Sequence, residues 1–117
     1  MTADSSIPRH QLPAAITTYL TAHQHREAAT AMTTFTTDAA VTDEGRTYRG
    51  HDEIADWLRN AASGYTYSME FVGATRSDDS HVDVVQHLEG DFPGGVADLH
   101  FRFTLDDGLI SGLVIEP

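Results

Sequence analysis

The stretch that decides the fold is FTTDAAVTDEGRTYRGHDEIADW, residues 35–57. Its small apolar residues are typical of a buried strand, and they lead into an acid, Asp43. Two interpretations of Asp43 stay open. Its carboxylate either bonds to backbone N–H groups in the turn TDEG, or lies in an apolar pocket. In a pocket, loss of water raises the pKa of a carboxyl group from about 3.9 and makes the group a usable base.

Length and composition limit the class of protein. The 117 residues are enough for one domain with a core, since 40% of them are hydrophobic. The formal net charge of −11 argues against binding to nucleic acid or to an anionic membrane. The absence of cysteine excludes disulfides, thiolate nucleophiles and zinc–sulfur sites. We see no signal peptide and no apolar segment that could span a bilayer, so we expect a soluble, cytoplasmic protein.

Helical periodicity is confined to the first half of the chain. Residues 1–10 are polar and aperiodic and are expected to be flexible, whereas residues 11–117 are expected to form a single domain. Apolar residues at helical spacing predict three helices. Their stripes are Leu12, Ile16, Tyr19, Leu20 and His23; then Ala28, Ala31, Met32 and Phe35; then Ile54, Trp57, Leu58 and Ala61. Gly64 is expected to end the third helix.

Beyond Gly64, apolar and polar residues alternate in residues 65–71, 82–88 and 97–105, which predicts strands, and the apolar run 109–115 completes the set. The sequences RSDDS (76–80), DFPGG (91–95) and DDG (106–108) are typical of turns between them. Helices followed by an antiparallel meander predict an α+β domain, with the helices packed on one face of the sheet.

This order of elements resembles the SnoaL-like and ketosteroid-isomerase-like proteins of the nuclear-transport-factor-like superfamily. The opening stretch and HFRFTLDDGLI (residues 100–110) carry the resemblance, which covers about residues 12–116. It implies a cone in which three N-terminal helices pack on a curved, mostly antiparallel sheet around an internal pocket. The superfamily contains isomerases, cyclases, dehydratases, hydrolases and non-catalytic binding proteins, so the fold alone does not imply one activity.

The resemblance also implies two catalytic positions. The base of ketosteroid isomerase corresponds to Asp43, and the tyrosine that donates a hydrogen bond to its oxyanion corresponds to Tyr19, at the family's separation of 43 − 19 = 24 residues. The isomerase has a protonated acid where this chain has Leu99, and the neighbouring Asp98 points to the opposite face of its strand. The second oxyanion donor is therefore missing, and we do not expect an authentic steroid isomerase.

The apolar faces of the helices and the sheet predict the walls of the pocket. We expect the ligand-binding residues to be Phe35, Trp57, Met69, Phe71, Val84, Gln86, Leu99 and Phe101, around a small apolar molecule that bears a carbonyl group. Other roles stay open for three residues. Tyr19 and Trp57 are alternatively core aromatics, and the Gln86 amide alternatively bonds to the backbone or to water.

Three functions fit these features. The chain is an acid–base isomerase, cyclase or dehydratase that needs no cofactor, a non-catalytic pocket for a small apolar ligand, or a dimerisation domain with an unused cavity. No metal site is expected, because His23 and His25 point to different sides of a helix. The outward face of the sheet predicts a homodimer interface that contains Val85, His87, Asp98, His100 and Arg102.

Overall fold

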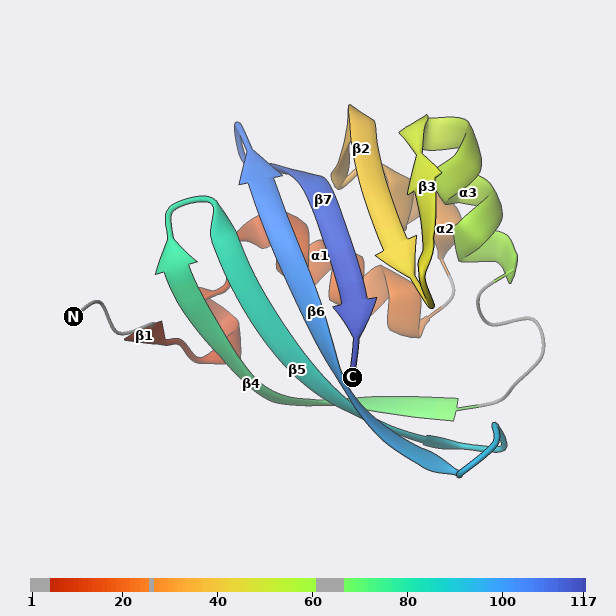
Figure 1. The fold of residues 1–117 in the computed structure, drawn as a ribbon. Helices are drawn as coiled ribbons and strands as arrows, with labels where there is room; N and C mark the ends of the chain where they lie inside the picture. The colour runs from red at the N-terminus through yellow and green to blue at the C-terminus, as the bar shows by residue number, and fades with distance from the viewer. Residues whose placement is uncertain (1–4, 26, 61–66) are drawn as a thin grey trace.

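The computed structural model describes residues 5–25, 27–60 and 67–117, and it has the predicted α+β architecture (Figure 1). The helices are α1 (Ala14–Gln24), α2 (Ala28–Met32) and α3 (Gly50–Asn60), preceded by the 3-10 helix η1 (Arg9–Gln11). The strands are β1 (Ser5–Ser6), β2 (Phe35–Asp43), β3 (Arg46–Arg49), β4 (Tyr67–Asp78), β5 (His81–Gly90), β6 (Val96–Asp106) and β7 (Leu109–Glu116). In the described ranges, no helix combines the length and apolar character needed to cross a membrane.

All strands join one curved sheet with the order β1-β4-β5-β6-β7-β2-β3. Every neighbouring pair is antiparallel except β2 and β7, which run parallel and bring the central stretch of the chain beside its C-terminal strand. Figure 1 shows the three helices gathered on the concave side of this sheet. The predicted cone of helices on a curved, mostly antiparallel sheet is confirmed.

The core lies between the helices and the concave face of the sheet. In β5, the buried residues Val82, Val84 and Gln86 alternate with more exposed neighbours, as expected for a strand with one face toward solvent. The largest side chains that are fully buried come from both layers: Tyr19, Phe101, Phe103, Ile16, Ile54, Ile110, Leu113, Val41 and Val84. Burial of these side chains is the main stabilising contribution to the fold.

The second predicted helix is shorter than expected, and the placement of Phe35 on it is wrong. Helix α2 ends at Met32, and Phe35 begins strand β2. The hydroxyl of Thr34 bonds to the carbonyl oxygen of Ala31 at 2.6 Å, which favours the turn over another helical residue. Four of residues 33–37 are threonine, whose β-branched side chains favour a strand. A β-hairpin therefore separates the second helix from the third.

The described part of the N-terminal segment pairs with the sheet. Ser5 and Ser6 pair with Arg76 and Thr75 at the edge of β4, and the Ile7 N–H donates to the carbonyl oxygen of Ala74 at 3.0 Å. Polar sequence alone does not predict this pairing, because the backbone groups of an edge strand make it. The expected end of the third helix at Gly64 lies outside the described residues.

Helix α3 begins at Gly50, whose backbone has φ 79°. We expect Gly50→Ala to lower the free energy of unfolding by about 1–2 kcal/mol, because a side chain disfavours this left-handed conformation. An added Cβ would lie 3.9 Å from the nearest atom, so the cost comes from the backbone and not from a clash. Denaturation in urea measures the change. Gly73→Ala is the matched control, since Gly73 lacks positive φ and has open space around it. Equal losses in both variants would contradict the prediction.

Candidate functional site

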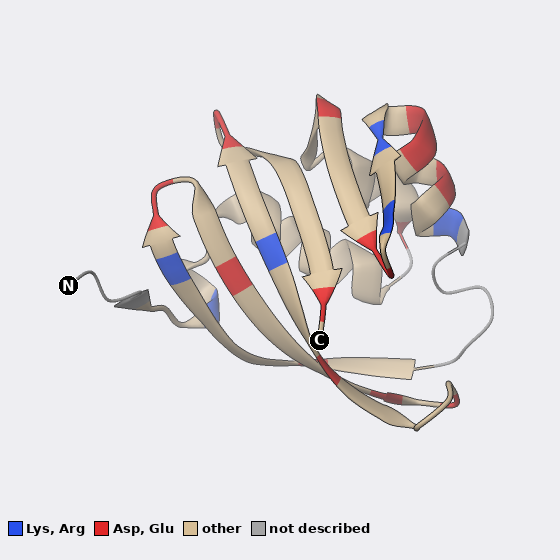
Figure 2. Ribbon diagram, viewed as in Figure 1, with Lys and Arg blue, Asp and Glu red and all other residues tan. Residues whose placement is uncertain are grey.

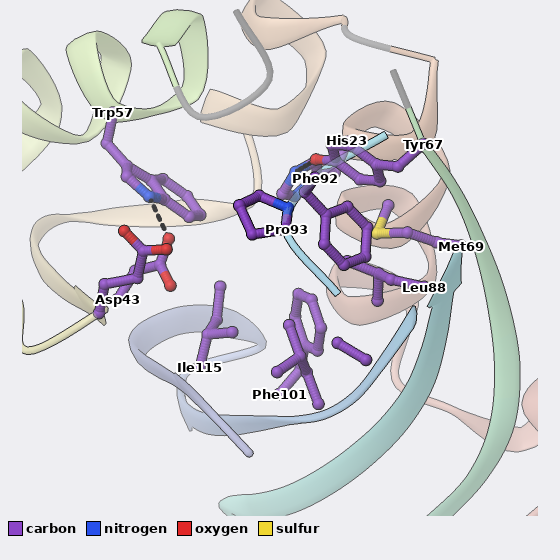
Figure 3. Close-up of a pocket in the computed structure, with 13 residues that line it drawn as sticks. His23, Asp43, Trp57, Tyr67, Met69, Leu88, Phe92, Pro93, Phe101 and Ile115 are labelled. Atoms are coloured by element: carbon purple, nitrogen blue, oxygen red, sulfur yellow. Dashed lines mark hydrogen bonds between the residues drawn. The ribbon is translucent and has the colours of Figure 1, made fainter. Parts of the chain in front are cut away.

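A cavity of about 410 Å³ opens between the helices and one end of the sheet (Figure 3). Its volume lies within the range of small-molecule sites, and most of its walls are apolar. The residues that line it are His23, Asp43, Glu44, Trp57, Tyr67, Met69, Leu88, Phe92, Pro93, Ala97, Leu99, Phe101 and Ile115. The polar side chains among them define what the cavity can do chemically.

Asp43 occupies the cavity wall at the end of β2. It pairs with Arg46 across the hairpin, and the two turn residues Glu44 and Gly45 have φ 53° and 78°, as a tight hairpin turn requires. The indole N–H of Trp57 on α3 donates a hydrogen bond to the Asp43 carboxylate at 3.1 Å, the dashed line in Figure 3. Asp43 thus borders the turn and also faces the cavity, so features of both open interpretations are present.

Burial is the main influence on the Asp43 carboxyl group. Loss of solvent raises its pKa, and the negative charge of Glu44 acts in the same direction. The hydrogen bonds from Trp57 and from the Glu44 backbone N–H oppose this change without cancelling it, so the pKa stays above its ordinary value. Asp43 therefore holds a proton more readily than a carboxylate in water, which suits a group that accepts and returns one.

Tyr19 and His23 form a hydrogen-bonded pair on α1. The Tyr19 side chain is fully buried, and its hydroxyl lies 2.7 Å from Nδ1 of His23. Burial raises the pKa of Tyr19 well above 10, with smaller contributions from Asp43 and Tyr67, so it stays a phenol. Burial also lowers the pKa of His23 to about 4, so the imidazole is neutral at pH 7. Of this pair, His23 lines the cavity and Tyr19 lies behind it.

Comparison with solved structures identifies the family. A Sinorhizobium meliloti protein, whose proposed activity is that of a polyketide cyclase, is 30% identical; the match covers 94% of this chain and 100% of that chain, with a TM-score of 0.87. The chain belongs to the SnoaL-like, ketosteroid-isomerase-like family. No family model matches the sequence, and no curated protein does.

Two more distant structures share the fold of this SnoaL-like domain. The Δ5-3-ketosteroid isomerase of a Mycobacterium species is 19% identical over 89% of this chain and 90% of its own, with a TM-score of 0.72. A Mycobacterium tuberculosis protein in complex with estradiol-17β-hemisuccinate is 14% identical over 92% and 95%, with a TM-score of 0.75. At these identities the comparison establishes the fold alone.

The SnoaL-like domain brings five of the predicted site residues to the cavity: Asp43, Trp57, Met69, Leu99 and Phe101. Their roles in binding or catalysis stay predictions. The remaining five, Tyr19, Phe35, Phe71, Val84 and Gln86, are not part of its lining. The cavity lies over the part of the sheet where Met69 pairs with Leu88 and Leu88 with Ala97. Alternation along a strand predicts which face of the sheet a side chain points to. It does not predict where along that face the helices leave a cavity.

The buried residues outside the lining have other partners. The ring of Phe35 packs edge-on against Tyr19 at 5.6 Å between centroids, and Val84 is fully buried in the core. The buried Gln86 amide donates to the sulfur of Met69 at 3.7 Å, a weak hydrogen bond that holds it beside a cavity residue. The position of Tyr19 agrees with the alternative of a core aromatic. The hydrogen bond of Gln86 goes to a side chain, and not to the backbone or to water as the alternative had it.

Several lining residues were not predicted from the sequence. His23 lies four residues after Tyr19 and hence on the same helix face, which was an available signal. Phe92 and Pro93 come from DFPGG, which reads as a turn; the ring of Phe92 packs edge-on against Tyr67 at 6.4 Å between centroids. Turn residues carry no periodicity, so their position over a cavity is not visible in the sequence. Within the described ranges, no group of three side chains is arranged to hold a metal ion.

Proposed function

We propose that the SnoaL-like domain binds a small apolar molecule with a carbonyl group and that Asp43 moves a proton at the carbon next to this carbonyl. The observation that carries the proposal is the Asp43 carboxylate, partly buried at the wall of an otherwise apolar cavity and held by the Trp57 indole N–H. Burial makes the carboxylate a better proton acceptor, and the hydrogen bond fixes its orientation.

The lining supports this class of substrate. Met69, Leu88, Leu99, Phe101 and Ile115 offer carbon surface that suits rings or an acyl chain. Two proteins with the same fold support this choice: one has the proposed activity of a polyketide cyclase, and another was solved with a steroid ester. Both kinds of molecule combine an apolar skeleton with a few oxygen atoms.

The reaction follows from the chemistry of such a carbonyl compound. The Asp43 carboxylate takes a proton from the carbon beside the carbonyl, and the electron pair of that C–H bond moves into the carbonyl to form an enolate. Return of the proton to another carbon gives an isomer. Attack of the enolate on a second carbonyl closes a ring and leaves an alkoxide, which takes the proton back from Asp43. Hydrogen-bond donors near the oxygen lower the barrier by stabilising the negative charge.

Deuterium exchange tests the proposal without knowledge of the natural substrate. The protein is incubated in D₂O with 1-tetralone and larger ketones of the same ring type, and deuterium beside the carbonyl is followed by mass spectrometry. We expect exchange that is faster than in buffer alone. Ketones that bind without faster exchange would contradict the catalytic proposal.

A second candidate function is binding without catalysis. It is favoured by the Tyr19 hydroxyl, which bonds to His23 instead of facing the cavity, and by Leu99, which offers no donor. Mass spectrometry of the freshly purified protein would identify a ligand that stays bound. A retained ligand together with the absence of ketone exchange would support this second function.

We also propose that two copies pair through the outer face of the sheet. Figure 2 shows a basic band on β6 beside an acidic band on β5, in an otherwise uncharged central part of the sheet. Arg102 lies 3.7 Å from Asp83 and 3.6 Å from Glu116, and Val114 next to it is 37% exposed. Such mixed surfaces are common in moderately polar interfaces.

Light scattering at tens of micromolar is expected to give the mass of a homodimer. The mass of a monomer would contradict the proposed pairing.

A further inference from the structure

The pair formed by Tyr19 and His23 determines where the imidazole carries its proton. The Tyr19 hydroxyl is fully buried, and His23 Nδ1 is its one hydrogen-bond partner among the residues that the structure describes. A buried phenol needs an acceptor for its proton, so Tyr19 donates and Nδ1 accepts. A neutral imidazole has a single N–H group, which is then at Nε2.

The Nε2 atom of His23 lies 3.5 Å from the hydroxyl of Tyr67. This distance is at the limit of hydrogen bonding, and both side chains line the cavity. A ligand oxygen at an ordinary distance of about 2.9 Å would be a better acceptor for this N–H group. The contact with Tyr67 therefore leaves room for a stronger one with a ligand.

Trp57 lies between this donor and the carboxylate. The His23 ring packs edge-on against the indole of Trp57 at 5.8 Å between centroids, and the same indole donates to Asp43. Figure 3 shows Asp43 at one end of the cavity and His23 with Tyr67 at the other, and the apolar residues lie along the space between them. A hydrogen-bond donor and a proton acceptor thus face the same space from two sides.

We infer that His23 binds the carbonyl oxygen of the ligand through its Nε2–H group, and that Tyr19 is a positioning residue that keeps the proton on Nε2. The inference rests on the proposed function, because it assigns a place to the ligand carbonyl. His23 then supplies a donor that Leu99 cannot supply and that Tyr19 supplies only indirectly. The low pKa of His23 agrees with this role, since the ring stays neutral above about pH 4.

Nitrogen NMR on protein with ¹⁵N-labelled histidine tests the position of the proton. At pH 7 we expect the spectrum of His23 to show a neutral ring with its proton on Nε2. In Tyr19→Phe, which keeps the aromatic ring but removes the hydroxyl, we expect a mixture of both tautomers. A proton on Nδ1 in the wild-type protein would overturn the inference whether or not any ligand binds.

Binding of two matched probes tests the role of His23. 1-Tetralone and tetralin share a ring skeleton, but only the first has a carbonyl oxygen. We expect the wild-type protein to bind 1-tetralone about tenfold more tightly than tetralin, as one hydrogen bond allows. His23→Leu is expected to remove this preference, and His23→Gln, which retains an N–H donor, to restore most of it.

The outcomes separate the inference from the function on which it rests. A preference for 1-tetralone that persists in His23→Leu would overturn the role of His23 and leave the apolar pocket standing. If neither probe binds to the wild-type protein, the proposed function is overturned, and the inference with it. Thermal unfolding of each variant establishes that it is folded, and His23→Gln keeps the test valid if His23→Leu does not fold.

Discussion

Replacement of Asp43 by asparagine is expected to lower the rate of proton exchange on a bound ketone by on the order of 10²–10⁴-fold, because the amide cannot accept the proton. The amide has nearly the same shape as the carboxylate, and its oxygen can still accept the hydrogen bond from Trp57. The rate of deuterium incorporation into 1-tetralone measures the change. A variant that exchanges as fast as the wild-type protein would show that Asp43 is not the base.

The stability of Asp43→Asn is the control for this experiment. The pKa of Asp43 is higher in the folded chain than in the unfolded chain, so its contribution to stability is present below about pH 4 and is lost as the pH rises through the folded pKa. The neutral amide avoids that loss. We therefore expect the variant to be at least as stable as the wild-type protein at pH 7, with the advantage gone at pH 3.5. Unfolding of the variant at pH 7 would instead identify Asp43 as a structural residue.

A β,γ-unsaturated steroid ketone is expected to bind in the cavity without efficient isomerisation. Burial of the apolar rings does not depend on a donor, so binding is retained. The isomerase family places an acid where Leu99 lines this cavity, and loss of one oxyanion donor costs about 3 kcal/mol, on the order of a hundredfold in rate. Ultraviolet absorbance of the conjugated product measures the rate. Turnover as fast as in an efficient isomerase would contradict the prediction.

The variant Leu99→Asp tests the reason for this expected low rate. A protonated acid at this position would return a donor to the cavity and is expected to raise any residual isomerisation. Leu99→Ala is the matched control, because it opens similar space without adding a donor. Equal rates in the two variants would show that the missing acid does not limit the reaction. Gln86, which we expected to bind the ligand, does not replace the missing donor, because its amide bonds to Met69 and is not part of the cavity lining.

Much of the fold was predictable because it depends on local periodicity. The 3.6-residue spacing of Ile16, Tyr19 and Leu20 and the alternation along residues 97–105 each reflect one buried face, and they predicted a helix and a strand where the structure has them. The prediction that placed Phe35 on the second helix was wrong, because an apolar residue at the end of a short helical stripe also fits the first position of a strand. The backbone groups of Ser5–Ser6 pair with β4, and no side-chain pattern reports such a pairing.

The sequence by itself determined the layers of this protein, its family resemblance and the presence of an acid at the end of a buried strand. Only the tertiary structure decided what surrounds that acid. The bond from Trp57 to Asp43 joins residues 14 apart, and the contact from His23 to Tyr67 joins residues 44 apart. Neither follows from local spacing, because each depends on how the helices lie over the sheet. The same packing buries the Tyr19 hydroxyl, turns it toward His23 and leaves His23 as the helix α1 side chain that faces the cavity.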